Sequence, residues 1–581
     1  MLKNSISLDK KALYLTLGIF FALAIYRAVH LWLTGFYVSD EYGYITRAMG
    51  GEIYSDRYFF GYVNIFLFQI FGISSVDKFV VFFPFYIFLW ISITIFSVYK
   101  MLKTFEFDER TRATSLISYI FVVSFSVLSL GIITEPVGLA MATLGLLAIV
   151  KVWKSWGYKK SVYALFSAAC FWAATYSREA YIAFFYGGLL IIVIISMMSS
   201  PKLVKKLRSI DRRWYLTLVL AILLYGAVVT VDYKMIGSRI TSEAASLVGS
   251  VTETFRSALV VESVTVTAPP STTAEQPATT ASEAITSNQP QVTQEQPTIS
   301  DLKSSQLRQI YTINPRIINT VYIFLGGLFL GSNPIIFFVL SIGFVLNLYR
   351  TIRYRREKDF VLLLCAGVAL ASYFGVSYIF STDPNYLTLR HFSTIIRFSA
   401  TATPAAFLLI PYVISIINKR NFSYAFIGSL LILTSVSAPV YSVYLSSNLP
   451  VQNPFYLNYK YPDVLLRDYF VKNIDDGPFR VIGNPFWSLT PGTNILKDHV
   501  KIYPYSKADL FEVEKWDEFY VFGSSRSLLT IEKTSPVLYD ILKGVDVQDQ
   551  GFRVIEVKTV LNETGVPFVN DVFLTKVVLE W

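Results

Sequence analysis

The sequence is short of charged residues and holds almost no cysteine or histidine. Charged residues fill 16% of the 581 positions, whereas soluble globular proteins have roughly 25%. The apolar share is 53% and the mean hydropathy is +0.48. This lack of charge excludes an ordinary soluble protein and predicts that much of the chain folds in lipid.

The scarcity of cysteine and histidine excludes several kinds of site. Cys170 and Cys365 both fall inside apolar runs, so they form neither a ligand cluster nor a disulfide framework. We find no metal-ligand spacing of His and Cys and no glycine-rich phosphate loop. The net charge of +10 comes mostly from short basic clusters between apolar runs. We interpret it as a topology signal, with no nucleic acid as a partner.

Apolar runs long enough to cross a bilayer recur along the chain. A hydrocarbon core about 30 Å thick needs about 20 apolar residues in one helix. The first run follows Lys10 and Lys11 and is too long for the core of a signal peptide, so we expect a retained anchor. We expect about eleven transmembrane helices, at roughly 12–34, 79–100, 113–130, 136–152, 161–177, 180–198, 214–232, 328–350, 359–380, 392–417 and 422–445.

Lysine and arginine cluster in alternate loops between these runs. By the positive-inside rule these loops and the N-terminus are cytoplasmic, and an odd number of spans places the C-terminus outside. Two further apolar stretches, 58–72 and 317–327, would invert this order if they crossed. We expect both to be interfacial or re-entrant helices in outer loops. The basic clusters are Lys100, Lys103, Arg110 and Arg112; Lys151, Lys154, Lys159 and Lys160; Lys202, Lys205, Lys206, Arg208, Arg212 and Arg213; Arg350, Arg353, Arg355, Arg356 and Lys358; and Lys419 and Arg420.

Composition divides the chain into four parts. Residues 1–239 form an N-terminal transmembrane module, and 316–445 hold the C-terminal transmembrane helices. Between them, 240–315 are rich in Ser, Thr, Pro and Gln, so we expect an outer disordered loop, either an O-glycosylated stalk or a plain linker. Residues 446–581 return to a soluble composition, with strand patterns in FRVIG, EFYVFG and FRVIEVKTVL and a helical DVLLRDYFVKNI. The expected fold is a polytopic α-helical membrane protein with an outer C-terminal α/β domain.

Ionisable residues gather in the outer loops of this topology. Asp40 and Glu41 follow the first span, Glu135 lies in the turn before the fourth, and Arg178 lies in the next outer turn. Charged groups near membrane depth are costly and mark candidate functional sites. A late outer segment adds Arg390, His391 and Arg397.

Each of these residues also has a structural interpretation. Asp40 is a favoured helix N-cap, and Glu41 suits the first turn of a helix. Glu135 precedes Pro136, a favoured first helical residue, and arginines at helix ends commonly reach from the apolar layer into water. His391 is more often a structural polar residue. We take Asp40, Glu41 and Glu135 as candidate catalytic residues and Arg178, Arg390 and Arg397 as candidate substrate-binding residues.

The set suits one kind of substrate. A carboxylate at the membrane surface can act as general base on an acceptor hydroxyl, and a guanidinium matches phosphate oxygens bidentately. A lipid-linked phosphosugar combines a buried isoprenoid tail, an interfacial phosphate and a sugar in water. The residues therefore indicate sugar transfer from a lipid carrier at the outer membrane face.

The order of these elements resembles the GT-C superfamily of membrane glycosyltransferases, especially its protein O-mannosyltransferases and lipid A aminoarabinose transferases. In that family an acidic residue or pair follows the first span, in a long outer loop with a surface helix. Asp40–Glu41, the downstream Tyr44 and Ala48, and the segment 58–72 match this arrangement.

Later motifs continue the resemblance over roughly residues 12–445. Thr134-Glu135-Pro136 matches a Thr-Glu-Pro-like turn at the fourth span, and Arg178 matches an arginine after the fifth. An Arg-Tyr … Pro element at a late span is matched loosely by Arg390–His391 or Arg397, with Pro404. The oligosaccharyltransferase branch carries a Trp-Trp-Asp motif that is missing here, since Lys515-Trp516-Asp517 is a poor substitute. This departure argues against transfer of a whole oligosaccharide.

The resemblance implies a glycosyltransferase that moves a monosaccharide, such as mannose, from a polyprenyl-phosphate donor, such as dolichol phosphate. The acceptor would be a protein, lipid or glycan on the non-cytoplasmic face. Asp40 would be the general base or the carboxylate that orients the acceptor, Glu135 would position acceptor or sugar, and Arg178 with a late arginine would hold the carrier phosphate. No resident cofactor is implied beyond this donor and membrane lipid, although the outer acids are also compatible with a divalent metal.

Two other classes of protein stay open. A transporter or flippase of a lipid-linked or anionic substrate calls for buried charges within spans and for broken helices at related positions. The spans are mostly free of central charge, and no internal repeat is evident. The third class is a non-enzymatic membrane scaffold that displays the outer domain.

Overall fold

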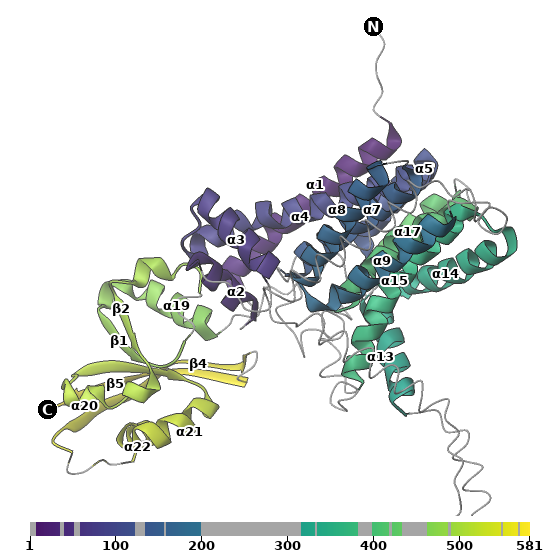
Figure 1. Ribbon diagram of the computed structural model, residues 1–581. Helices are drawn as coiled ribbons and strands as arrows, with labels where there is room; N and C mark the ends of the chain where they lie inside the picture. The colour runs from purple at the N-terminus through teal and green to yellow at the C-terminus, as the bar shows by residue number, and fades with distance from the viewer. Residues whose placement is uncertain are drawn as a thin grey trace, which may run out of the picture.

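Long helices form a bundle, and a smaller domain built on a β-sheet lies at one end of it (Figure 1). The computed structural model describes residues 7–34, 40–51, 58–122, 134–155, 158–198, 315–331, 334–381, 398–417, 421–432, 462–485, 490–545, 547, 550–566 and 570–581. The predicted span 214–232 and the predicted disordered loop 240–315, except its last residue, lie outside these residues.

Six helices of the described part are long and apolar enough to cross a membrane, which supports an integral membrane protein. The expected number of about eleven is not confirmed, because the other predicted spans form helices that are shorter or less apolar, or fall outside the described residues. The six candidate spans are Leu8–Leu33, Val76–Thr104, Glu135–Lys154, Ile335–Tyr354, Glu357–Phe380 and Ser399–Ile417. The bundle helices are α1 (Leu8–Thr34), α4 (Val76–Thr104), α5 (Glu109–Ser118), α7 (Thr134–Lys154), α8 (Tyr158–Thr175), α9 (Ile182–Met198), α14 (Pro334–Tyr354), α15 (Glu357–Phe380) and α17 (Thr403–Ile417).

The two stretches predicted to be interfacial or re-entrant are both helical. The first is α3 (Tyr58–Phe71), which packs against α2 (Asp40–Met49). The second is α13 (Pro315–Gly331), which packs against α15. The hydroxyl of Thr320 on α13 donates to Ser381 Oγ at 3.0 Å, and the Arg316 guanidinium lies 3.9 Å from the ring centre of Tyr378. Their place relative to a membrane stays a prediction.

Apolar side chains explain how the bundle holds together. Its core is one continuous cluster that runs from Phe20 of α1 and Phe79 of α4 through α7 and α8 to Leu409 of α17. Glycines bring helices close: a Cβ at Gly145 of α7 would lie only 2.5 Å from the Phe171 ring on α8. The α7–α8 pair is therefore tightly packed, and this packing positions the turns at the ends of both helices.

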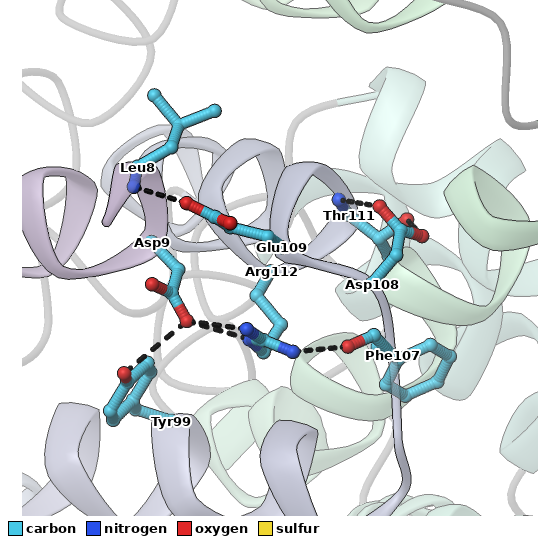
Figure 2. Close-up of polar contacts among 8 residues, drawn as sticks. All are labelled: Leu8, Asp9, Tyr99, Phe107, Asp108, Glu109, Thr111 and Arg112. Carbon is cyan, nitrogen blue, oxygen red and sulfur yellow. Dashed lines mark hydrogen bonds and ion pairs between the residues drawn. The ribbon is translucent and has the colours of Figure 1, made fainter.

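Polar contacts identify the two ends of the bundle. At the far end, the start of α1 is tied to α5: Asp9 forms an ion pair with Arg112 at 2.7 Å and accepts a hydrogen bond from Tyr99 at 3.3 Å (Figure 2). Leu8 N donates to Glu109 in the same network (Figure 2). Asp108 caps α5 by accepting from Thr111 N at 2.9 Å (Figure 2). The opposite end, which we call the domain end, is defined by the last turn of α1 and the first turn of α4, where the sheet domain is attached.

The described basic clusters lie at the far end. Lys154 at the end of α7 pairs with Glu106 at 2.8 Å, just after α4. Lys358 at the start of α15 lies 4.7 Å from the ring centre of Phe107. The alternation that the sequence predicts therefore agrees with the packing, although which membrane face the far end occupies stays a prediction.

The C-terminal domain is a five-stranded mixed sheet with the strand order β2-β1-β3-β5-β4. β1, β2 and β3 are parallel, whereas β5 runs antiparallel to β3 and to β4. One face packs around Phe470 and Leu496, and the other around Trp516 and Phe519. The expected α/β architecture is confirmed. Its elements are α19 (Pro462–Lys472), β1 (Phe479–Ile482), β2 (Val500–Tyr503), α20 (Leu510–Val513), β3 (Glu518–Gly523), α21 (Ser525–Thr534), α22 (Pro536–Lys543), β4 (Arg553–Val566) and β5 (Asn570–Glu580).

The sheet domain is joined to the bundle by side chains of both parts. Arg467 of α19, only 7% exposed, donates to the carbonyl oxygen of Trp32 at 3.0 Å and to that of Pro491 at 2.8 Å. Asp77, in the first turn of α4, accepts from Gly492 N at 2.6 Å and from the Asn494 amide. Gly492 has φ +79°, a conformation that favours glycine. These contacts hold the domain beside the chain ends that flank the predicted catalytic loop.

Candidate active site

The domain end brings together turns that are distant in the sequence. α7 begins there, because its last turn pairs with Glu106 at the far end. α8 ends there, next to α3: the rings of Tyr58 and Tyr176 meet edge to face at 6.0 Å, and those of Phe59 and Trp172 at 6.5 Å. The helix α3 and its neighbour α2 are thus beside the turn that carries Arg178.

An ion pair links the first turn of α7 to the turn after α8. Arg178 Nη1 lies 3.0 Å from Glu135 Oε1, and the two side chains are 8% and 4% exposed. Glu135 is placed well for its charge, because the N-terminus of a helix stabilises a nearby carboxylate. Two charges are seldom removed from water together, so a buried pair at a helix end is a candidate functional site.

The local fold explains why Arg178 points at Glu135. Its backbone N–H donates to the Ala174 carbonyl at 2.9 Å, continuing the last turn of α8, and its own φ and ψ are extended at −156° and 121°. A 3-10 turn, Glu179–Tyr181, follows and is anchored by Ser372 Oγ of α15, which donates to the Ala180 carbonyl at 2.5 Å. The Arg178 guanidinium also lies 4.7 Å from the ring centre of Phe398. The guanidinium is therefore held between a carboxylate and an aromatic ring.

The other predicted site residues are only partly described. Asp40 and Glu41 start α2, and their side chains lie outside the described residues. The same helix buries Ile45 and Ala48 in the bundle core, which fixes α2 against it. Arg390, His391 and Arg397 fall in 382–397, also outside the described residues. The structure therefore brings Glu135 and Arg178 together and leaves the remaining assignments as predictions.

Sequence reasoning missed a buried polar pair within the first span. Arg27 and His30 of α1 are 1% and 0% exposed, and the Arg27 guanidinium contacts His30 Nδ1. Arg27 lies about 10 Å along the helix axis from Thr34, at 1.5 Å per residue. The signal was visible, because arginine and histidine one turn apart interrupt an apolar run. The pair lies toward the end of the predicted span 12–34, so the expectation that the spans are mostly free of central charge stays a prediction.

Among the described side chains, no three His, Cys, Asp or Glu residues are grouped so that they could hold a metal ion. The side chains of Asp40 and Glu41 are not among those compared. A metal bound by the outer acids accordingly stays an open expectation.

No protein-family model matches the chain, and no curated protein matches it. Among solved structures, the apo form of an oligosaccharyltransferase from Archaeoglobus fulgidus is similar, with 11% identity and a TM-score of 0.40 over 90% of this chain and 70% of that one. The form of the same enzyme in complex with Zn and sulfate has 12% identity and a TM-score of 0.39 over 91% and 71%. Similarity at this level does not establish a common fold or activity.

Proposed function

We propose that this protein is a membrane glycosyltransferase that moves a sugar from a polyprenyl-phosphate carrier to an acceptor on the non-cytoplasmic face. One observation carries the proposal: a buried Glu135–Arg178 pair lies at the end of the bundle where α2, which begins at Asp40, and the sheet domain are also attached. The order of acidic and basic motifs, which resembles GT-C enzymes, supports the same activity.

Each residue has a distinct role in this proposal. The Arg178 guanidinium binds the carrier phosphate, and Glu135 orients Arg178 and neutralises its charge before the donor arrives. Asp40 takes the proton from the acceptor hydroxyl as that oxygen attacks the anomeric carbon and the bond to the carrier phosphate breaks. Arg390 or Arg397 supplies a second cation, and Glu41 shares the acidic loop with Asp40. The isoprenoid tail stays in the bilayer.

A transporter or flippase of an anionic or lipid-linked substrate is the second candidate. The observation that favours it is the buried Arg27–His30 pair, since charge inside a span often lines a substrate path. The ion pair at the domain end favours the enzyme, because a lipid phosphate is held at a membrane surface and not at mid-depth.

Substitution of Arg178 tests the proposed role most sharply. Arg178→Lys keeps the charge but loses the bidentate fork, so the KM for a polyprenyl-phosphate-linked sugar should rise about tenfold, with a smaller change in kcat. Arg350→Lys is a matched control at the far end, where Arg350 lies 3.9 Å from Asp359, and should leave both constants unchanged. An unchanged donor KM in Arg178→Lys would exclude Arg178 from the phosphate site.

A further inference from the structure

Tyr181 closes the turn that carries Arg178, and it is completely buried. Its backbone N–H donates to the Arg178 carbonyl at 3.1 Å, which joins the two residues in one turn. Its ring packs against Phe184, with ring centres 5.6 Å apart. The position of the phenol is thus determined by the same turn that orients the guanidinium.

The other wall of the Tyr181 site is the backbone of α7. A Cβ at Gly138 would lie 2.6 Å from Tyr181 Cε2 and 3.0 Å from Cδ2, closer than carbon atoms approach one another. Gly138 comes one helical turn after Glu135, so this glycine lets the phenol ring pack against α7 one turn from that residue. The charges of Glu135 and Arg178 both act on the phenol.

The Tyr181 hydroxyl is buried and has no hydrogen-bond partner among the described residues. A buried donor without an acceptor is unfavourable, and such a group next to an ion pair is poised to bond when the pair rearranges. Glu135 and Arg178 each have further interactions, whereas the phenol hydroxyl has no hydrogen-bond partner among the described residues.

Binding of a phosphate by Arg178 would favour a new hydrogen bond to Glu135. When the guanidinium of Arg178 turns its N–H groups to phosphate oxygens, its ion pair with Glu135 weakens, while this carboxylate is still 4% exposed. A buried carboxylate whose ion pair weakens is less stable, which would oppose binding of the donor substrate.

From this geometry we infer that Tyr181 is a positioning residue: its hydroxyl donates a hydrogen bond to Glu135 when Arg178 binds the carrier phosphate. The inference rests on the proposed function and deepens it, because it adds a residue that stabilises Glu135 whenever Arg178 binds the carrier phosphate, which is a diester in the sugar-linked donor and a monoester in the released carrier. The phenol keeps its proton throughout, and no covalent bond changes. Gly138 is required because only a glycine leaves room for the ring at this place.

Tyr181→Phe tests whether the Tyr181 hydroxyl donates to Glu135 when phosphate binds. Farnesyl phosphate is the probe, and farnesol is its uncharged control. The variant removes only a hydroxyl that has no hydrogen-bond partner among the described residues, so the Tm without ligand should stay the same or rise slightly. In Tyr181→Phe the affinity for farnesyl phosphate should fall about tenfold, while the affinity for farnesol is unchanged. Gly138→Ala should lower the affinity for farnesyl phosphate by about the same factor. Tyr86→Phe on α4 is the matched control, because Tyr86 is also fully buried with a hydroxyl that lacks a partner among the described residues.

The outcomes separate the inference from the proposed function. If farnesyl phosphate binds the unsubstituted protein no better than farnesol, the phosphate assignment itself is wrong. If Arg178→Lys weakens phosphate binding but Tyr181→Phe does not, Arg178 still binds the carrier phosphate, and the inferred hydrogen bond from Tyr181 to Glu135 is wrong. A lower Tm in Tyr181→Phe with unchanged phosphate affinity would make Tyr181 a packing residue only, which also overturns the inference.

Discussion

Arg467 of the sheet domain donates a hydrogen bond to the carbonyl oxygen of Trp32 at the end of α1, at 3.0 Å. In the same domain, the backbone N–H of Gly492 donates to the Asp77 carboxylate at the start of α4. The domain therefore contacts both α1 and α4. These two helices flank the segment that contains Asp40 and Glu41.

Asp77→Ala should loosen this attachment. The amide of Gly492 loses its acceptor, so its hydrogen exchange should become at least tenfold faster, while the β3 and β5 amides keep their protection. Asp475→Ala, at an exposed acid of the same domain, is the control and should change nothing. Equal exchange at Gly492 in all three proteins would show that the contact does not hold the domain.

Asp40→Asn tests the proposed base. The amide keeps the size of the side chain but no longer accepts a proton, so transfer should fall by about 10²-fold or more while donor binding survives. Loss of activity in Glu41→Gln together with normal activity in Asp40→Asn would show that Glu41, and not Asp40, is the base. Normal transfer in both variants would remove this loop from the chemistry.

The membrane orientation is tested by two Asn-x-Ser/Thr sequences. Asn562 lies on the exposed side of β4, and Asn421 starts the short helix Asn421–Ile432. If the sheet domain is non-cytoplasmic, an impermeant reagent added from outside should label Asn562→Cys, and Asn421→Cys should react only after the membrane is opened. The reverse pattern would overturn the orientation and with it the assignment of the outer acids.

The ion pair of Asp9 with Arg112 should stabilise the bundle more than that of Glu106 with Lys154. The Asp9 side chain is 2% exposed, so Arg112→Met leaves a buried carboxylate unpaired and should cost about 3–5 kcal/mol, seen as a lower Tm in detergent. Glu106, at 72% exposure, is screened by water, and Glu106→Gln should leave the Tm unchanged. Equal Tm values for the two variants would contradict this ranking.

Hydropathy predicts the helices well where apolar residues alone decide the outcome. The expected spans 79–100 and 359–380 correspond to α4 and α15, and the strand patterns correspond to β1, β3 and β4. The boundaries differ by several residues, because polar ends such as Asp77 extend a helix through caps and contacts that hydropathy does not measure.

The pairing of Glu135 with Arg178 was beyond sequence reasoning. Both residues were singled out for their place in outer turns, but their distance depends on how α7 packs against α8, which small side chains such as Gly145 decide. The strand order of the sheet and the attachment by Arg467 are likewise set by tertiary packing. Tyr181 carries no sequence signal, because a tyrosine at the start of an apolar helix is ordinary.

Sugar transfer by the purified, unsubstituted protein tests the central claim most directly. The protein is reconstituted in lipid vesicles with polyprenyl-phosphate-linked tritiated mannose or glucose and with a detergent extract of membranes as the source of acceptors. We expect label to leave the carrier and appear in a protein, lipid or glycan fraction, with release of free polyprenyl phosphate. If instead the intact carrier-linked sugar only changes leaflet, with no label transferred from either donor, the protein is a flippase and the proposed activity is wrong.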